Sequence, residues 1–238
     1  MSMVPRRPPP NRLLEALPRR ESRRVLEECE SVDLKFGDVL YRPATAIRHV
    51  YFPTDSFISV MIPIEGTGNL EVALVGNEGM LGLPLVLGVN VSPLRALVQG
   101  AGPAWRMSAV AFAQALKQSP WLCRRLNRYL QVRMSQLAQT AACTRFHVVE
   151  QRLARCLLMT QDRAHGDDFH ATHEFLAHML GVRRVGITKA ASALQARSLI
   201  RYHRGQVTIH DRVGMKSAAC GCYQADRDTY DSLLAVAR

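Results

Sequence analysis

Short apolar segments alternate with turn residues between positions 32 and 107. The segments at 39–41, 49–52, 57–62, 70–75 and 96–99 are rich in β-branched and apolar residues, and Gly, Pro, Asn and Asp separate them. This spacing is typical of a small antiparallel barrel or sandwich. We therefore predict a small antiparallel barrel or sandwich in this region, with one short helix near 79–87 and short helices ahead of it, between residues 11 and 30.

A long uninterrupted helix is predicted from residue 120 to about 144. Ser119 suits its N-cap and Pro120 its first position, and at 1.5 Å per residue the helix spans about 37 Å. A stripe on so long a helix favours a seam between two copies of the chain, although packing against the chain's own barrel is the alternative. The predicted dimer interface is Leu122, Leu126, Tyr129, Leu130, Arg133, Leu137 and Ala141, and Thr140 and Thr144 lie on the same face.

Two further helices with a tight connection follow. A helix over 146–163 has one apolar face, made of Phe146, Val149, Leu153, Cys156 and Leu157. Thr172 then suits the N-cap of a helix that ends at Gly181, and another helix begins near Arg183. Helix, glycine turn and helix form the pattern of a helix-turn-helix at 172–196.

The second of these helices has two distinct faces at 100° per residue. Ile187, Ala190, Ala191 and Leu194 share the apolar face, whereas Arg184, Val185, Thr188 and Lys189 share the other. Arginine and lysine can donate to guanine, and valine can meet a thymine methyl group. Arg183 is available to a phosphate.

A β-hairpin is predicted at 199–209, turning at Arg204-Gly205-Gln206. Such a hairpin is the wing of a winged helix, and Arg201, His203 and Arg204 could reach the DNA backbone. Contacts of this kind add affinity and salt dependence but little sequence information.

Together these elements predict an α+β chain with five segments. They are a disordered tail (1–10), a β-barrel with N-terminal helices (11–118), a dimerisation helix (119–145), a winged helix-turn-helix (146–216) and a C-terminal extension (217–238).

Charge is distributed in agreement with this division. The net charge is +11, but residues 33–105 carry four basic and six acidic side chains, whereas 145–216 carry twelve basic and six acidic ones. A polyanionic partner is therefore expected at the C-terminal part. No apolar run is long enough for a membrane span and the N-terminus does not resemble a secretory signal, so we expect a cytoplasmic protein with reduced thiols.

The chain resembles the Crp/Fnr superfamily of transcriptional regulators from residue 11 to about 211, in the order sensor barrel, dimer helix and winged helix-turn-helix. The resemblance implies that the sensor barrel is an antiparallel β jelly-roll of the cyclic-nucleotide-binding type. The most specific stretch is Leu-Ala-His-Met-Leu-Gly-Val-Arg-Arg-Val-Gly-Ile-Thr-Lys at 176–189, similar to the family's Leu-Ala-x-x-Leu-Gly-x-Ser-Arg-Glu-Thr-Val-x-Arg. The resemblance places Arg184 and Lys189 at base-reading positions, and Arg183 and Gly186 at phosphate-binding ones. Val185 replaces the usual glutamate, so the target sequence does not follow from the family. The complete predicted DNA-binding set is Thr172, Arg183, Arg184, Val185, Gly186, Thr188, Lys189, Arg201, His203 and Arg204.

The sensor region departs from cyclic-nucleotide-binding members of this family, which hold ribose and phosphate with a Gly-Glu-Leu-Gly-Leu and an Arg-Ser/Thr-Ala segment. Here Met80 stands at the glutamate position and Leu94 at the arginine position, with Arg95 one residue late. A buried phosphate without its charged partner is costly, so we expect no cyclic nucleotide.

No cofactor is predicted. Cys29 alone lies near the N-terminus, which disfavours an iron-sulfur sensor of the fumarate-nitrate type, and His49 alone does not indicate haem. Cys220 and Cys222, with His203 or His210, offer a weak metal or redox signal. We expect instead unpaired thiols on a C-terminal tail.

Two other functions remain as alternatives. A cupin-like enzyme would need clustered histidines in the barrel, which His49 alone does not supply. A ligand-binding regulatory subunit would act on a protein partner through its C-terminal helices. The expected function is a homodimeric regulator of double-stranded DNA, not an enzyme, that contacts RNA polymerase if it activates transcription.

Overall fold

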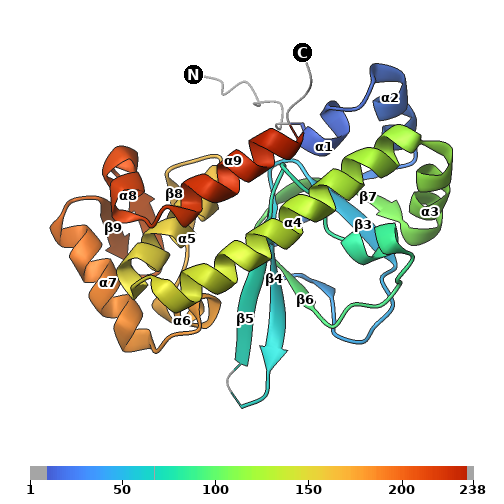
Figure 1. Cartoon of the computed structure of the whole chain (residues 1–238). Coiled ribbons are helices and arrows are strands. Elements are labelled where there is room, and N and C mark those ends of the chain that lie inside the picture. The colour runs from blue at the N-terminus through green and yellow to red at the C-terminus, as the bar shows by residue number, and fades with distance from the viewer. Residues whose placement is uncertain (1–9, 67, 235–238) are drawn as a thin grey trace, which may run out of the picture.

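The computed structural model describes residues 10–66 and 68–234. It has two lobes joined by a long helix (Figure 1). The tail predicted at 1–10 lies outside the described residues except for Pro10. Among the described residues, no helix combines the length and the apolar character that a membrane crossing needs.

The N-terminal lobe is a pair of antiparallel sheets that enclose an apolar core. One sheet has the order β1-β7-β3 and the other β2-β6-β4-β5. Their strands are β1 (Glu30–Leu34), β2 (Val39–Tyr41), β3 (His49–Pro53), β4 (Phe57–Ile64), β5 (Gly68–Val75), β6 (Arg95–Gly100) and β7 (Gly102–Ser108). The prediction of an antiparallel β domain is confirmed, and each of the five predicted segments is a strand.

The sequence pattern did not predict strands β1 and β7 or helix α3 (Ala109–Gln118) of this lobe. β1 carries Glu30 and Asp33 and has one buried residue, so it has little apolar periodicity. β7 contains Pro103 and Arg106 and pairs with β1 and β3. The helices of this lobe are α1 (Arg12–Glu15), α2 (Arg19–Glu27), the short 3-10 helix η1 (Leu83–Leu87) and α3 (Ala109–Gln118).

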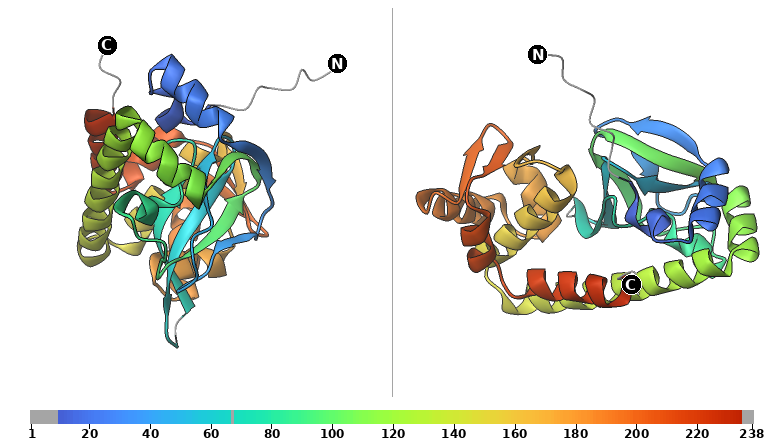
Figure 2. Two further views of the ribbon diagram at one scale, coloured as in Figure 1. Left: turned by 90° about the vertical axis from the view of Figure 1, so that its right-hand side faces the viewer. Right: turned by 90° about the horizontal axis from the view of Figure 1, so that it is seen from above.

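Helix α4 (Pro120–Phe146) connects the lobes. The Ser119 hydroxyl accepts a hydrogen bond from the Leu122 amide at 3.2 Å and Pro120 occupies the first turn, as predicted. Helix α9 (Cys222–Leu234) lies beside α4 along much of its length (Figure 2). The C-terminal extension is therefore a packed helix, and the expectation of a tail was wrong.

Part of the predicted dimer stripe is buried inside its own chain. Leu122, Leu126 and Tyr129 belong to the core between α4 and the N-terminal lobe, and the buried Arg133 guanidinium donates to the Leu74 carbonyl and to Gln136. The assignment of these four residues to a dimer interface was wrong, because the β domain and helices of the same chain cover them. Periodicity alone does not say which neighbour covers an apolar face.

The C-terminal lobe is built on α5 (Val149–Ala164). Around it lie β8 (Asp168–His170), α6 (His173–Leu180), α7 (Arg184–Ala196), β9 (Ile200–His203), β10 (Gln206–Ile209) and α8 (Arg212–Ala218). The three strands form a sheet of order β8-β10-β9. The predicted inward position of Phe146 was wrong: it closes α4 with 75% of its surface exposed, because α4 extends through it and α5 starts only at Val149.

The lobes also meet directly where α6 contacts β5. The Leu70 methyl group lies 3.1 Å from the position that a side-chain carbon on Gly181 would occupy. Arg163 on α5 donates to one Glu78 oxygen on the N-terminal lobe, from Nε at 2.9 Å and from Nη2 at 2.7 Å. These contacts fix the position of the C-terminal lobe in the structure.

Candidate nucleic-acid interface

Helices α6 and α7 are joined by a turn that depends on Gly181. Thr172 caps α6, since its hydroxyl accepts from the Phe175 amide at 3.1 Å. Gly181 ends α6 with φ +61°, in the left-handed region that favours glycine. Val182 follows, partly buried, and Arg183 is the N-cap of α7.

The two faces predicted for α7 separate as expected. Ile187, Ala190, Ala191 and Leu194 are buried against α5 and α6. The outer face exposes Arg184, Val185, Thr188 and Lys189, with Arg183 exposed beside it, whereas Gly186 is partly buried. Val185 is 58% exposed. An exposed valine on this face could make an apolar contact to a thymine methyl group.

The wing begins immediately after α7. Strands β9 and β10 pair antiparallel and turn through Arg204 and Gly205, both with positive φ, 49° and 83°, as in the tight turns that join hairpin strands. Arg201, His203 and Arg204 are exposed. The predicted hairpin is confirmed.

The basic side chains of this surface are not neutralised by the protein. Arg183, Arg184, Lys189, Arg201 and Arg204 form no ion pair with any described residue. At the far end of α7, by contrast, Arg197 pairs with Glu150 at 3.2 Å. Cations without partners remain available to phosphate oxygens.

Sequence reasoning missed His173, which joins three elements of this surface. Its Nδ1 lies 3.2 Å from the Thr188 hydroxyl on α7, and its ring stacks on Tyr202 of β9. The Thr188 hydroxyl also donates to the Arg184 carbonyl at 3.1 Å, so Thr188 is engaged within the protein. Desolvation lowers the pKa of His173, and the charge of Arg184 lowers it further. No sequence signal connects positions 173, 188 and 202 before the fold is known.

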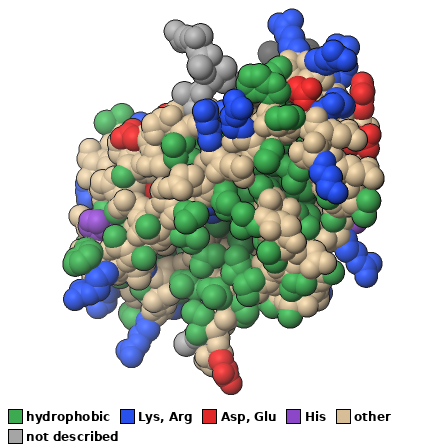
Figure 3. All heavy atoms as spheres, turned by 45° about the vertical axis from the view of Figure 1, so that its right-hand side comes forward, with side chains coloured by type: hydrophobic (Ala, Val, Ile, Leu, Met, Phe, Trp, Pro, Cys, Tyr) green, Lys and Arg blue, Asp and Glu red, His purple; other side chains and the backbone are tan. Residues whose placement is uncertain are grey.

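A groove lies between the β domain and α4. Its volume is about 360 Å³ and its lining is almost wholly apolar, with Leu81, Leu94 and Leu137 among the residues that form it. Figure 3 shows hydrophobic side chains gathered around a hollow on this side of the molecule. Met80 and Arg95 also line the groove, and the buried Nε of Arg95 has no hydrogen-bond partner among the described residues.

A helix-turn-helix followed by a two-stranded wing defines a winged helix-turn-helix DNA-binding protein. Residues 151–218 match the family model described as the Crp-like helix-turn-helix domain. Residues 151–218 thus form a Crp-like helix-turn-helix domain, and an antiparallel β domain precedes it in the chain.

Solved structures share this fold. FixK2 from Bradyrhizobium japonicum is 13% identical with a TM-score of 0.68, and the match covers 81% of this chain and 98% of that one. A CRP/FNR family transcriptional regulator from Thermus thermophilus is 20% identical with a TM-score of 0.66, covering 80% and 98%. The c-di-GMP-responsive global regulator CLP of Xanthomonas campestris is 16% identical with a TM-score of 0.65, covering 79% and 97%. Comparison of the sequence with curated proteins gives no match.

Proposed function

We propose that this chain is a homodimeric regulator that binds specific DNA sequences through α7 and whose β domain senses a signal other than a cyclic nucleotide. One observation carries the DNA-binding part: α7 buries one complete face and exposes Arg184, Val185 and Lys189 on the other. An exposed helix face of this composition suits the major groove. Thr172 and Gly186 at the two helix starts, Arg183, and the wing residues Arg201, His203 and Arg204 would contact the backbone.

The dimer would form through the outer face of α4. Leu130, Met134, Leu137 and Ala141 follow each other at the heptad spacing of 4, 3 and 4 residues. Met134 is 58% exposed and Leu137 46%. Of the stripe predicted from the sequence, Leu130, Leu137 and Ala141 remain available, and Met134 joins them. A dimer would present two copies of α7 to successive major grooves, about 34 Å apart.

The groove is the proposed sensor site. Its lining is mostly apolar, with Arg95 and Arg133 as the charged exceptions, so it suits a largely apolar molecule that could carry one acidic group toward the unpartnered Nε of Arg95. Leu130, Met134 and Leu137 line the groove as well as the outer face of α4, so an occupant would contact the same helix that forms the dimer. A change in the groove would then alter the populations of dimer arrangements and hence DNA affinity.

Selection of bound sites from random duplex DNA tests whether α7 binds specific DNA sequences. We expect a two-fold symmetric site, for which the double variant R184A/K189A loses at least about 30-fold in affinity, since each good base contact contributes about 1 to 3 kcal/mol. The control R20A/R23A removes the same charge from exposed positions on α2 and should bind within about twofold of wild type. Equal affinity of R184A/K189A and wild type would favour the alternative of a regulatory subunit that acts on a protein.

Addition of small molecules to the same binding assay tests the sensor. We expect cyclic AMP to leave DNA affinity unchanged and the apolar fraction of a cell extract to change it. Ala73→Trp, which fills the groove from β5, should remove that response while DNA binding persists. A response to cyclic AMP would contradict the proposal. We also propose that the protein acts in the cytoplasm. We expect it to contact RNA polymerase only if it activates transcription.

A further inference from the structure

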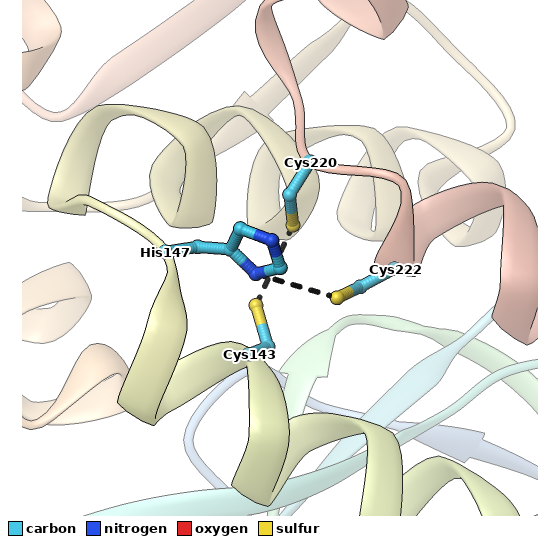
Figure 4. A group of neighbouring side chains, drawn as sticks. All are labelled: Cys143, His147, Cys220 and Cys222. Carbon is cyan, nitrogen blue, oxygen red and sulfur yellow. Dashed lines mark hydrogen bonds between the residues drawn. The ribbon is translucent and has the colours of Figure 1, made fainter.

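Three buried cysteines form a cluster apart from the two main cores. Cys143, Cys220 and Cys222 are 2%, 5% and 3% exposed and pack against one another. All three are free thiols. The imidazole of His147 lies beside them, and Figure 4 shows the four side chains pointing toward a common centre.

The distances within this cluster suit a single tetrahedral metal ion. The Cys143 and Cys220 sulfurs are 3.5 Å apart, and the Cys222 sulfur is 3.5 Å from Nδ1 of His147. All four candidate ligand atoms lie within 4.8 Å of one another. Zinc–sulfur bonds of about 2.3 Å and zinc–nitrogen bonds of about 2.0 Å place the ligand atoms of a tetrahedron roughly 3.5 to 3.8 Å apart. The Cys143–Cys220 and Cys222–His147 distances agree with this, and the other ligand atoms would move by about 1 Å or less.

We propose that Cys143, His147, Cys220 and Cys222 bind one structural zinc ion. Three cysteines and one histidine are an established ligand set for structural zinc, and four protein ligands leave no position open for a substrate. Thiolates select zinc over magnesium or calcium, which prefer oxygen. The Gln139 amide donates to the Cys222 sulfur at 3.0 Å, a contact that orients this ligand and would partly neutralise a bound thiolate.

Two other uses of these residues explain less of the arrangement. An iron-sulfur cluster distributes its ligands over two or four irons and needs them further apart. A disulfide between Cys143 and Cys220 would leave the convergence of Cys222 and His147 without a role. The single ion accounts for all four side chains.

The site would lock the junction between the lobes. Cys143 and His147 lie at the end of α4, His147 being its C-cap, and α5 starts two residues later. Cys220 lies in the turn between α8 and α9, and Cys222 is the first residue of α9. One ion would therefore join the long helix, the DNA-binding lobe and the C-terminal helix at a single point. This inference stands independently of the function proposed for the groove and for α7.

Zinc content of the full-length chain tests the site. The reduced protein is stripped with a chelator, reloaded with zinc alone, desalted and analysed for metal, and we expect about one zinc per chain. Cys143→Ser and Cys222→Ser should each lower the retained zinc at least about tenfold. The controls Cys29→Ser and Cys123→Ser alter thiols outside the cluster and should retain it. Cobalt in place of zinc should give the intense visible absorption of a tetrahedral thiolate complex.

A second pair of variants keeps the test decisive if the cysteine variants unfold. His147→Ala should lose zinc, whereas His147→Cys, which restores a fourth ligand, should retain it with unchanged circular dichroism. The proposal is overturned if folded wild type retains less than about a tenth of an equivalent of zinc. It is also overturned if His147→Ala retains as much zinc as wild type, or if the cluster thiols of the zinc-treated protein are found joined in a disulfide.

Discussion

The imidazole of His173 stacks on the phenol ring of Tyr202, with ring centroids 4.2 Å apart and 25° between the ring planes. The Tyr202 hydroxyl donates to the Ala171 carbonyl at 2.9 Å, and its backbone amide donates to Gln195 at 2.7 Å. The stack and the hydrogen bonds to Thr188 and Gln195 thus hold the start of α6, α7 and the wing together. The orientation of the wing relative to α7 depends on this contact.

His173→Ala should lower the free energy of unfolding of the C-terminal lobe by about 1 to 2 kcal/mol, since it removes an aromatic contact and a hydrogen bond. Denaturant unfolding followed by circular dichroism measures this change. His210→Ala is the control, because His210 is exposed just after the wing, and it should stay within about 0.5 kcal/mol of wild type. Equal losses in the two variants would show that the stack contributes nothing specific.

The lowered pKa of His173 gives this region a pH dependence. Desolvation is the main cause and Arg184 the second. Because the unfolded chain protonates more readily, the contribution of neutral His173 is complete above the unfolded pKa of about 6.5 and is lost as the pH falls through the lowered folded value. His173→Phe keeps an aromatic ring without titrating. The fall in unfolding midpoint between pH 7.5 and 5.5 should therefore be smaller in this variant, and an equal fall would contradict the assignment.

Arg204 at the tip of the wing should bind phosphate and not bases. Arg204→Ala is expected to weaken binding to all DNA sequences by a similar factor and to reduce the slope of log affinity against log salt by about 0.9, the value for one phosphate contact. Binding titrations between low and high salt measure the slope. Arg197→Ala, at a residue paired with Glu150, should leave it unchanged. A change in the preferred sequence would instead make Arg204 a base reader.

Two outer residues of α4 should control the oligomeric state. M134E/L137E places two charges on the proposed seam and is expected to convert a dimer to a monomer in sedimentation at micromolar concentration, because desolvating unpaired carboxylates is costly. V110E/V213E is the matched control, since Val110 and Val213 are 71% and 76% exposed on other helices. A wild-type monomer, with or without DNA, would contradict the homodimer.

Arg163 and Glu78 form a buried ion pair between the lobes, with side-chain exposures of 8% and 13%. Arg163→Met leaves a buried carboxylate without its cation and should cost about 3 to 5 kcal/mol. R163M/E78M removes both charges and should recover most of that loss. Denaturant unfolding of both variants checks the difference, with Arg106→Met in the exposed pair with Glu30 as a control that costs less than about 1 kcal/mol. Additive losses in the double variant would contradict a direct coupling.

Local patterns predicted those parts of the molecule that depend on short-range chemistry. The caps at Ser119 and Thr172, the turn at Gly181 and the two faces of α7 follow from neighbouring residues. The partner of a face does not, and for this reason Leu122 and Tyr129 were assigned to a second copy of the chain although its own β domain covers them.

The convergence of residues that lie far apart in the chain could not be predicted from the sequence either. Cys143 and His147 are separated from Cys220 and Cys222 by the whole C-terminal lobe, and only the return of α9 along α4 brings them together. The sequence therefore showed the close pair of cysteines but offered His203 or His210 as the remaining ligands. The described structure brings neither of these histidines into the cluster.

Gly181, which lies against Leu70 of the other lobe, has two structural roles. Its left-handed backbone ends α6, and its missing side chain leaves room for a strand of the other lobe. An asparagine at this position would tolerate the backbone conformation, but its side-chain carbon would require the Leu70 methyl group to move by a few tenths of an ångström. Gly181 therefore sets the spacing between α6 and β5 as well as ending α6. A substitution there could change how α6 and α7 pack against the N-terminal lobe while leaving both helices intact.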